Sequence, residues 1–317
     1  MSERFTDLAY ITGDFKKANT SVSQAGLKTM DWFHSTHLTH YLKFRKEKPS
    51  ISFIAGSFIH DFFQKNINKE DVNLNEAEEE FGNLIYSLDF AEEKQKIKAQ
   101  FILKYIKDYV SNHLQAIEEI SKSKNWQTEK GFSDWYDDKY MGSTLDIATE
   151  GYIDCLNDDE KIFTEHKNRF GSVRLSPLKM NSRGTTANRI GDWVYAKANK
   201  ITKPQFTHCM QDAVYSKHLK DKYKPFLVYV SETDYTIFNE DNCWELSPEG
   251  LKYFFKKFIQ ICIQRQEMMK FANGDIRRLA CLIGVDWSEI RNYKSNFMMQ
   301  NYHEEDMQKL IKFYEEL

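Results

Sequence analysis

A strand–turn–strand pattern near the middle of the chain restricts the fold more than any other feature of this sequence. Segments 143–156 and 161–167 are short and rich in β-branched and aromatic residues, and the polar triplet 157–159 before the second segment is typical of a tight turn. The other elements predicted for this part are one strand before the hairpin, then a helix and two strands after it: 126–134, 204–220, 226–231 and 235–238. This order predicts an α/β protein of the α+β kind, with a central mixed β-sheet flanked by helices.

Helical patterns lie on both sides of this central part. Before it, Ser21 and Ser23 can cap a helix that runs toward Leu42, and apolar residues recur at helical spacing within 51–66 and 74–121. After it, a third zone is again helical. Its expected signals are a start at Ser247-Pro248, a second start at Asp286 and a last helix over 303–317.

The chain contains neither internal repeats nor a low-complexity tract, and Pro and Gly are too few for long linkers. We therefore expect a single domain over residues 1–317. It would consist of a helical N-terminal part, a core and C-terminal helices, over 20–123, 124–240 and 241–317.

Composition excludes several classes of protein. Hydrophobic residues make up 41% of the 317 residues, which suffices for a sizeable core. The five cysteines are odd in number and include no CxxC pair, so a disulfide framework or a Cys-based zinc or iron–sulfur site is not expected. Neither a signal peptide's apolar core nor a span long enough for a bilayer is visible, which predicts a cytoplasmic protein without a membrane partner.

Charged side chains are expected to meet on the central hairpin. Folding about the turn places Asp154 opposite residues 163–165, and directly opposed side chains lie about 5 Å apart at Cβ. Glu165 and Lys167 are two residues apart on one strand, so they share a face. Two carboxylates that close repel each other unless a cation joins them. The hairpin therefore predicts that two carboxylates and an amine converge on one point.

This set of groups suits metal-assisted cleavage of a phosphodiester bond. Carboxylates hold Mg²⁺, and the bound ion lowers the pKa of a water molecule and neutralises charge that builds on the phosphate. Lys167 would position the attacking water or take its proton, and the second role requires a lowered pKa. The alternative is a surface hairpin with ordinary charges, because Glu-x-Lys also occurs at Glu92 within a helical pattern.

Two helical segments add polar residues that the hairpin lacks. Ser57, His60 and Gln64 fall on one stripe of the helix over 51–66, one turn apart. Gln211 and Tyr215 are one turn apart on the helix over 204–220, where they could hold a phosphate or orient Lys167. Each set taken alone is more typical of a structural role.

The order of the four motifs resembles the RecB-type branch of the PD-(D/E)XK nucleases. The motifs are GSxxH, GxxD, ExK and QxxxY, at 56–60, 151–154, 165–167 and 211–215. The opening SxSxxxLK at 21–28 before GSxxH is most similar to the exonuclease VIII group, which is related to lambda exonuclease. The similarity covers roughly residues 20–240 and implies a restriction-endonuclease-like core.

The resemblance also implies roles for the motif residues. Lys167 would be the catalytic lysine, supported near the substrate phosphate by Gln211 and Tyr215. A Mg²⁺ ion, for which Mn²⁺ could substitute, would be surrounded by four residues: His60, Asp154, Glu165 and, through its backbone carbonyl, His166. Many RecB-type members carry an acidic residue where this chain has Gln64, so the number of metal ions stays open.

The implied activity is a 5′-to-3′ exonuclease that resects double-stranded DNA ends for recombination, in the cytoplasm or, for a phage protein, in the host cytoplasm. A single-strand annealing or recombination protein would be its partner, and a homo-oligomer would fit the family. Two alternatives stay open. One is a single-strand-specific exonuclease of the mitochondrial genome maintenance type, and the other is a DNA-binding module without catalysis.

Positive charge concentrates directly after the proposed catalytic strand. Residues 161–203 hold ten Lys or Arg against two acids in a chain of net charge −3, with Phe170, Trp193 and Tyr195 interleaved. Such a segment is typical of a phosphate-tracking surface or a flexible loop over the active site, and a solvated basic loop is the alternative. The residues expected to contact DNA are Ser57, Arg169, Arg174, Lys179, Arg183 and Arg189.

Overall fold

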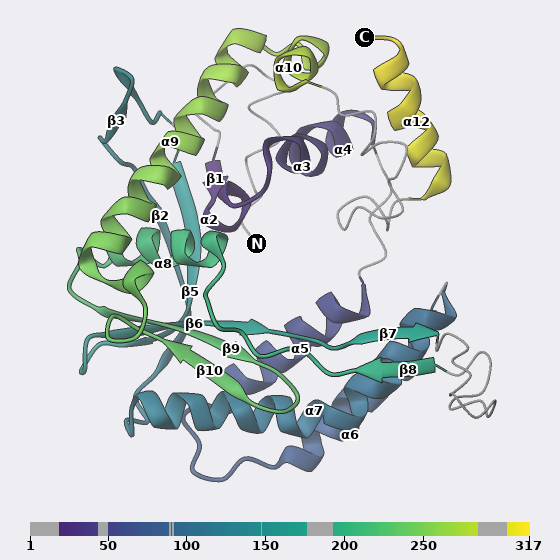
Figure 1. The fold of residues 1–317 in the computed structure, drawn as a ribbon, viewed down its shortest axis with the longest axis vertical. Coiled ribbons are helices and arrows are strands. Elements are labelled where there is room, and N and C mark those ends of the chain that lie inside the picture. Colours follow the sequence, from purple (N-terminus) through teal and green to yellow (C-terminus); the bar gives the residue numbers. More distant parts are fainter. Residues whose placement is uncertain are drawn as a thin grey trace, which may run out of the picture.

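A central β-sheet lies between two layers of helices in the computed structural model, which describes residues 19–43, 50–88, 90, 92–146, 148–175, 193–284 and 303–317 (Figure 1). One face is covered by α8 (Phe206–His218) and α9 (Pro248–Ala272). The other face is covered by α5 (Ile51–Asn66), α6 (Leu74–Tyr86) and α7 (Glu93–Ile120). This arrangement confirms the predicted α+β fold class with a mixed sheet flanked by helices.

The sheet has six strands in the order β1-β5-β6-β9-β10, with β2 paired to β5 as well. Their bounds are β1 Asn19–Ser21, β2 Gln127–Asp134, β5 Ala148–Asn157, β6 Ile162–Asn168, β9 Lys224–Val230 and β10 Tyr235–Phe238. β5 runs parallel to β1 and antiparallel to β2 and β6. β6 runs parallel to β9, which is antiparallel to β10. The crossover from β6 to β9 passes through α8, as a parallel pair requires.

The two inner strands are buried on both faces. Phe163 of β6 and Leu227 of β9 pack in the cluster that contains α8 and α9, whereas Val228 and Val230 pack against α5, α6 and α7. Alternation along β9 explains this split, because successive side chains point to opposite faces. Apolar residues on both sides therefore fix β6 and β9 at the centre of the molecule.

The N-terminal segment differs from the single helix predicted from Ser21 toward Leu42. Instead, β1 joins the sheet and is followed by α2 (Val22–Ala25), α3 (Thr29–Trp32), a π-helical turn (Phe33–Leu38) and α4 (Thr39–Tyr41). The break coincides with Gly26, where a Cβ would lie 2.7 Å from the side chain of Thr207 on α8. Close packing of the chain against α8 therefore interrupts the helix at this glycine.

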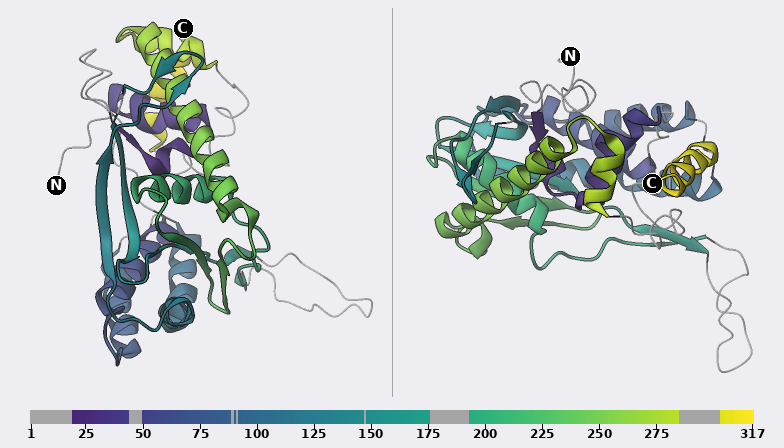
Figure 2. Two further views of the ribbon diagram at one scale, coloured as in Figure 1. Left: turned by 90° about the vertical axis from the view of Figure 1, so that its left-hand side faces the viewer. Right: turned by 90° about the horizontal axis from the view of Figure 1, so that it is seen from above.

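Two short hairpins lie outside the main sheet. β3 (Lys139–Tyr140) pairs with β4 (Ser143–Thr144), and β7 (Ser172–Leu175) pairs with β8 (Trp193–Ala196). The second hairpin follows β6 closely and lies beside α7 (Figure 1, Figure 2). A flexible loop was one expectation for this basic segment. Its described residues form paired strands, and Val173 is buried beside α7.

The C-terminal part is helical, as expected. After a 3₁₀ turn (Trp244–Leu246), α9 begins with Ser247 as its N-cap and Pro248 at its first position. α10 (Ile276–Ile283) is capped by Asp275, and α12 spans Glu304–Glu315. The predicted helix start at Asp286 lies outside the described residues.

Two expectations from composition can be compared with the fold. All five cysteines are free thiols, as predicted, and four of them are buried. In the part of the chain that the structure describes, the helices are too short or too polar to cross a membrane.

Candidate metal centre

The candidate site lies where β5 and β6 separate. Their ladder pairs Cys155 with Thr164 and ends there, so Asp154 and Glu165 occupy the next position along the two strands. Beyond it, β5 pairs with β1 instead. The Oδ2 atom of Asp154 accepts a hydrogen bond of 2.7 Å from the backbone N–H of His166, which replaces a ladder bond. The predicted hairpin is therefore present, and its open end holds both carboxylates.

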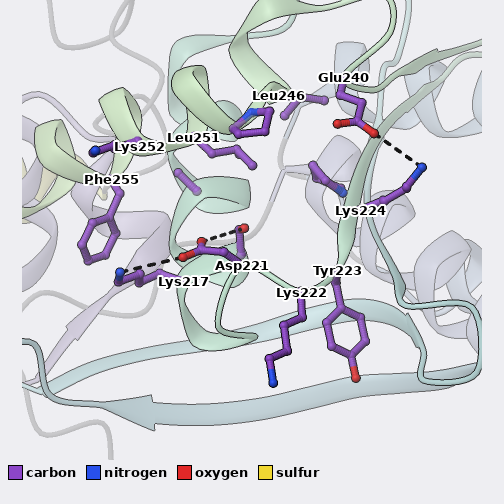
Figure 3. A pocket seen from close by; sticks show the side chains of 14 residues that line it. Lys217, Asp221, Lys222, Tyr223, Lys224, Glu240, Leu246, Leu251, Lys252 and Phe255 are labelled. Atoms are coloured by element: carbon purple, nitrogen blue, oxygen red, sulfur yellow. Dashed lines mark hydrogen bonds and ion pairs between the residues drawn. The ribbon is translucent and has the colours of Figure 1, made fainter.

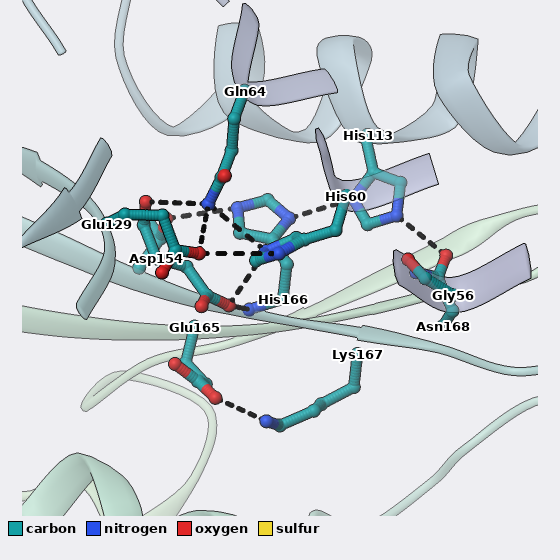
Figure 4. Close-up of polar contacts among 11 residues, drawn as sticks. Gly56, His60, Gln64, His113, Glu129, Asp154, Glu165, His166, Lys167 and Asn168 are labelled. Carbon is teal, nitrogen blue, oxygen red and sulfur yellow. Dashed lines mark hydrogen bonds and ion pairs between the residues drawn. The ribbon is translucent and has the colours of Figure 1, made fainter. Parts of the chain in front are cut away.

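Opposite charges pair closely at this fork (Figure 4). The Nε2 atom of His60, from α5, lies 3.2 Å from Oδ2 of Asp154. The ammonium group of Lys167 forms a short ion pair with Oε1 of Glu165. Glu165 is 2% exposed, and its other oxygen, Oε2, receives no hydrogen bond from the described residues. The site therefore contains a buried carboxylate oxygen that still needs a partner.

Burial and neighbouring charges shift the pKa values of these groups. Burial, followed by the Asp154 carboxylate, raises the pKa of Glu165 to about 8 despite the nearby Lys167. Burial also disfavours ionised Asp154, but the adjacent His60 and Lys167 outweigh it and hold the pKa of Asp154 below its usual range. Burial likewise opposes a charge on His60, yet Asp154 and Glu165 raise its pKa to about 9. The carboxylates thus interact strongly, as expected for a site that accommodates a cation.

Lys167 keeps its charge in this environment. Burial disfavours the ammonium form, but the carboxylates of Glu165 and Asp154 outweigh burial and raise the pKa of Lys167. A role as general base would need the opposite shift. The raised pKa therefore favours Lys167 as a positively charged group that positions water or phosphate.

A third carboxylate, Glu129, borders the site and was not predicted from the sequence. The register of β2 on β5 places it opposite Asp154. Its φ of 52° lies in the left-handed region, which is uncommon for a residue with a side chain. Its Oε1 atom lies 3.7 Å from Nδ1 of His60, and one ligand atom each from His60, Glu129 and Asp154 lie within 4.8 Å of one another. Neighbouring strands β2, β5 and β6 thus each contribute one acidic residue.

Gln64 connects these groups. Its amide nitrogen donates to Oε1 of Glu129 at 3.0 Å and to the backbone oxygen of Asp154 at 3.2 Å, and it lies 3.5 Å from Nε2 of His60. A carboxylate at this position could not donate either bond. The glutamine therefore ties α5 to β2 and β5 where many members of the resembled family have an acid.

A cavity of about 450 Å³ opens onto the fork. Its lining includes Ser57 and His60 from α5 and Asp154, His166 and Lys167 from the two strands. Ser57 is exposed, consistent with its predicted position at the substrate side. Five of the residues singled out from the sequence thus line one cavity.

The two predicted residues of α8 lie deeper. Gln211 and Tyr215 are buried beneath the sheet, and the Tyr215 ring packs edge-on against Phe132 and Phe163. Burial, and then Glu165, raise the pKa of Tyr215, which places this ring near the carboxylates. Among the described residues, no hydrogen bond joins Gln211 or Tyr215 to Lys167, so their supporting role stays a prediction.

Asp212, between them, is a second residue that sequence reasoning passed over. It is fully buried, and neither carboxylate oxygen has a hydrogen-bond partner in the described ranges. Burial, followed by Glu165, raises its pKa well above the usual range.

The predicted DNA-binding residues are only partly described. Arg174 is exposed on β7, whereas the guanidinium of Arg169 donates to the backbone oxygen of Asn199. Lys179, Arg183 and Arg189 lie outside the described residues. Tyr195, one of the aromatic residues interleaved in this basic segment, stacks on Phe101 and Tyr105 of α7, with ring centroids 4.9 and 5.8 Å away.

A second cavity, of about 540 Å³, lies between the end of α8 and the start of α9 (Figure 3). Four lysines line it, and its two acidic residues pair with two of them, Asp221 with Lys217 and Glu240 with Lys224. It contains no histidine or cysteine. Both acids and two of the four lysines are therefore paired with one another.

Comparisons with known proteins add little. No model of a known protein family matches the chain, and no curated protein matches it. A solved structure described as "Crystal structure of SSO0001" is similar over 60% of this chain and 84% of that chain, with 13% identity and a TM-score of 0.27. A likeness of this extent assigns neither a fold nor a function.

Proposed function

We propose that this chain is a metal-dependent deoxyribonuclease that degrades DNA from its ends. The observation that supports the proposal best is that Asp154 and Glu165 occupy the first position beyond the β5–β6 ladder, with the Lys167 ammonium paired to Glu165. A buried oxygen of Glu165 without a hydrogen-bond donor lies in the same place. Carboxylates and an ammonium group arranged in this way suit cleavage of a phosphodiester bond.

The donor set fits a hard divalent cation such as Mg²⁺ or Mn²⁺. Asp154 and Glu165 would hold it with carboxylate oxygens, together with His60 and, as the resemblance implies, the backbone carbonyl of His166. Bound there, the cation would lower the pKa of a water molecule and neutralise charge on the scissile phosphate. The orphaned Oε2 of Glu165 is the atom that most needs such a partner.

The other roles in this proposal belong to side chains and a backbone N–H of the protein itself. Asp154 is oriented by the backbone N–H of His166 and by His60, so its carboxylate keeps one direction. Lys167, held beside Glu165, stabilises negative charge on the phosphate and orients the attacking water. Ser57, which lines the cavity, and the exposed Arg174 of β7 would bind the DNA backbone.

The direction and substrate are finer points of the proposal and rest on the order of the four motifs. We infer 5′-to-3′ resection of duplex ends, which leaves a 3′ overhang for an annealing or recombination protein. Labelled duplexes and single strands with either end blocked, incubated with Mg²⁺ and with EDTA as a control, test this. Degradation only from free 3′ ends rejects the direction, and activity only on single strands favours the single-strand exonuclease. DNA binding without cleavage of any substrate rejects the enzyme.

Glu129→Gln is expected to raise the Mg²⁺ concentration needed for half-maximal cleavage by roughly tenfold, since one carboxylate beside the cation is lost. The substitution keeps the shape of the side chain and an oxygen that can accept from Gln64. Asp137→Asn, an exposed acid after β2, serves as the control. An unchanged Mg²⁺ requirement would show that Glu129 does not contribute to cation binding.

Arg174→Ala is expected to weaken DNA binding at low salt and to lower the salt slope of log K by about one, the effect of losing one phosphate contact. Fluorescence anisotropy of a labelled duplex over a range of KCl concentrations measures it. Lys252→Ala, an exposed residue that lines the second cavity, should leave the slope unchanged. Equal slopes for Arg174→Ala and the unchanged protein would show that Arg174 does not contact a DNA phosphate.

A further inference from the structure

Two buried histidines lie behind the catalytic strand, on the face of β6 that is turned away from Lys167. His113 of α7 is fully buried, and His166 of β6 is 4% exposed. Their Nδ1 atoms are 2.9 Å apart. The ring of Phe63 from α5 packs on both, with centroids 5.0 and 4.8 Å away, and helps to exclude water from the pair.

Three hydrogen bonds extend from this pair to its neighbours (Figure 4). Nε2 of His113 lies 2.8 Å from Oδ1 of Asn168, and Nδ2 of Asn168 lies 3.4 Å from the backbone oxygen of Gly56 on α5. At the other end, Nε2 of His166 lies 3.0 Å from the hydroxyl of Thr164. With the bond between the two rings, these contacts form one continuous chain across α5, α7 and β6.

With both rings neutral, this series of hydrogen bonds has one consistent direction. Asn168 donates through Nδ2 to Gly56, so its Oδ1 must accept, and Nε2 of His113 must carry a proton. A neutral His113 then accepts at Nδ1, which requires the proton of His166 to be on Nδ1. His166 therefore accepts at Nε2 from the Thr164 hydroxyl. Both rings are buried, which disfavours a charge on either of them.

We propose that His113 is a positioning residue for the candidate metal centre, acting through His166. The inference rests on the proposed function, because His113 would affect the orientation of Asp154 and the binding of the cation. The His166 backbone N–H donates to Asp154, and His166 lies between Glu165 and Lys167. Fixing the His166 ring thus fixes the part of β6 that has lost its pairing with β5. The bond from Asn168 to Gly56 fixes the same segment relative to the helix that carries His60.

Breaking this series of hydrogen bonds should weaken cation binding more than it lowers the stability of the fold. His113→Phe removes both ring bonds but keeps an aromatic ring against Phe63. We expect the Mg²⁺ concentration for half-maximal cleavage to rise by at least tenfold, the usual effect of losing a group that orients a metal ligand. His113→Gln restores one donor and one acceptor and should recover part of this loss. Val110→Ala, which removes buried volume one turn earlier on α7, is the matched control and should leave the Mg²⁺ requirement unchanged.

A second measurement does not depend on activity or on metal. Nitrogen-15 NMR of the unchanged, metal-free protein at neutral pH should show both rings neutral, with the proton on Nδ1 of His166 and on Nε2 of His113. The reverse tautomers, or a charged ring, would overturn the proposed chain. If the tautomers are as expected but no DNA is cleaved, the proposed function is wrong, whereas the proposed series of hydrogen bonds is correct. If His113→Phe and Val110→Ala change the Mg²⁺ requirement equally, the role of His113 is structural only.

Discussion

Lys167→Ala is expected to reduce Mg²⁺-dependent DNA cleavage by about a thousandfold, because a charged group positioned at the reacting phosphate is lost. The side chain is about three-quarters buried and forms an ion pair with Glu165, which holds its charge at the site. Glu165 can tolerate the loss at neutral pH, because burial raises its pKa to about 8 and it can take up a proton. The fold should therefore survive, and the rate of cleavage is the quantity that changes.

Two further variants make this expectation specific. Asp154→Asn keeps an acceptor for the His166 N–H but removes the negative charge, so it should reduce cleavage to a similar extent. Lys224→Ala removes an exposed lysine of the neighbouring strand β9 and should have little effect. Initial rates on an end-labelled duplex, together with anisotropy for DNA binding, provide the comparison. Cleavage by Lys167→Ala and Asp154→Asn at the rate of the unchanged protein would remove this fork as the active site.

The parts of the site that depend on local sequence were predictable. The turn predicted at 157–159 lies at 158–161 in the structure, and it fixes the register that places Asp154 next to Glu165. The helix over 51–66 was predicted with its observed bounds because its apolar residues follow a helical period and Ser50 caps it. His60 could therefore be assigned to a face, and the resemblance supplied the reason to bring that face to the hairpin.

The parts that depend on long-range pairing were not predictable. Glu129 reaches the site through the register of β2 on β5 and a left-handed backbone conformation, and a single sequence reveals neither. His113 lies on a long helix whose pattern explains it equally well as a core residue. The strand β1 was not predicted, since its three residues gain their conformation by pairing with β5. In each case a contact between distant segments decided the outcome.

Acid is expected to destabilise the fold by about 6 kcal/mol between pH 7 and pH 4 through two histidines far from the candidate metal centre, about 3 kcal/mol from each. His34 and His37 lie on the π-helical turn and are almost completely buried. Burial lowers the pKa of His34 to about 4, and burial together with Arg265 lowers that of His37 to about 3. In the unfolded chain both would titrate near pH 6.5. As the pH falls below 6.5, the unfolded state therefore takes up protons that the folded state excludes, and stability decreases.

Urea unfolding at several pH values measures this loss. His34→Gln removes one titrating ring while its amide can still bond to the Tyr314 hydroxyl, which lies 2.5 Å from Nε2 of His34 and belongs to α12. The difference in unfolding free energy between pH 7 and pH 4 should shrink by about 3 kcal/mol in this variant, because the unfolded state no longer gains a proton there. His218→Gln, at a partly exposed histidine, should follow the unchanged protein. If His34→Gln loses as much stability in acid as the unchanged protein does, His34 is protonated in the folded state. The contact between the π-helical turn and α12 then does not depend on a neutral ring.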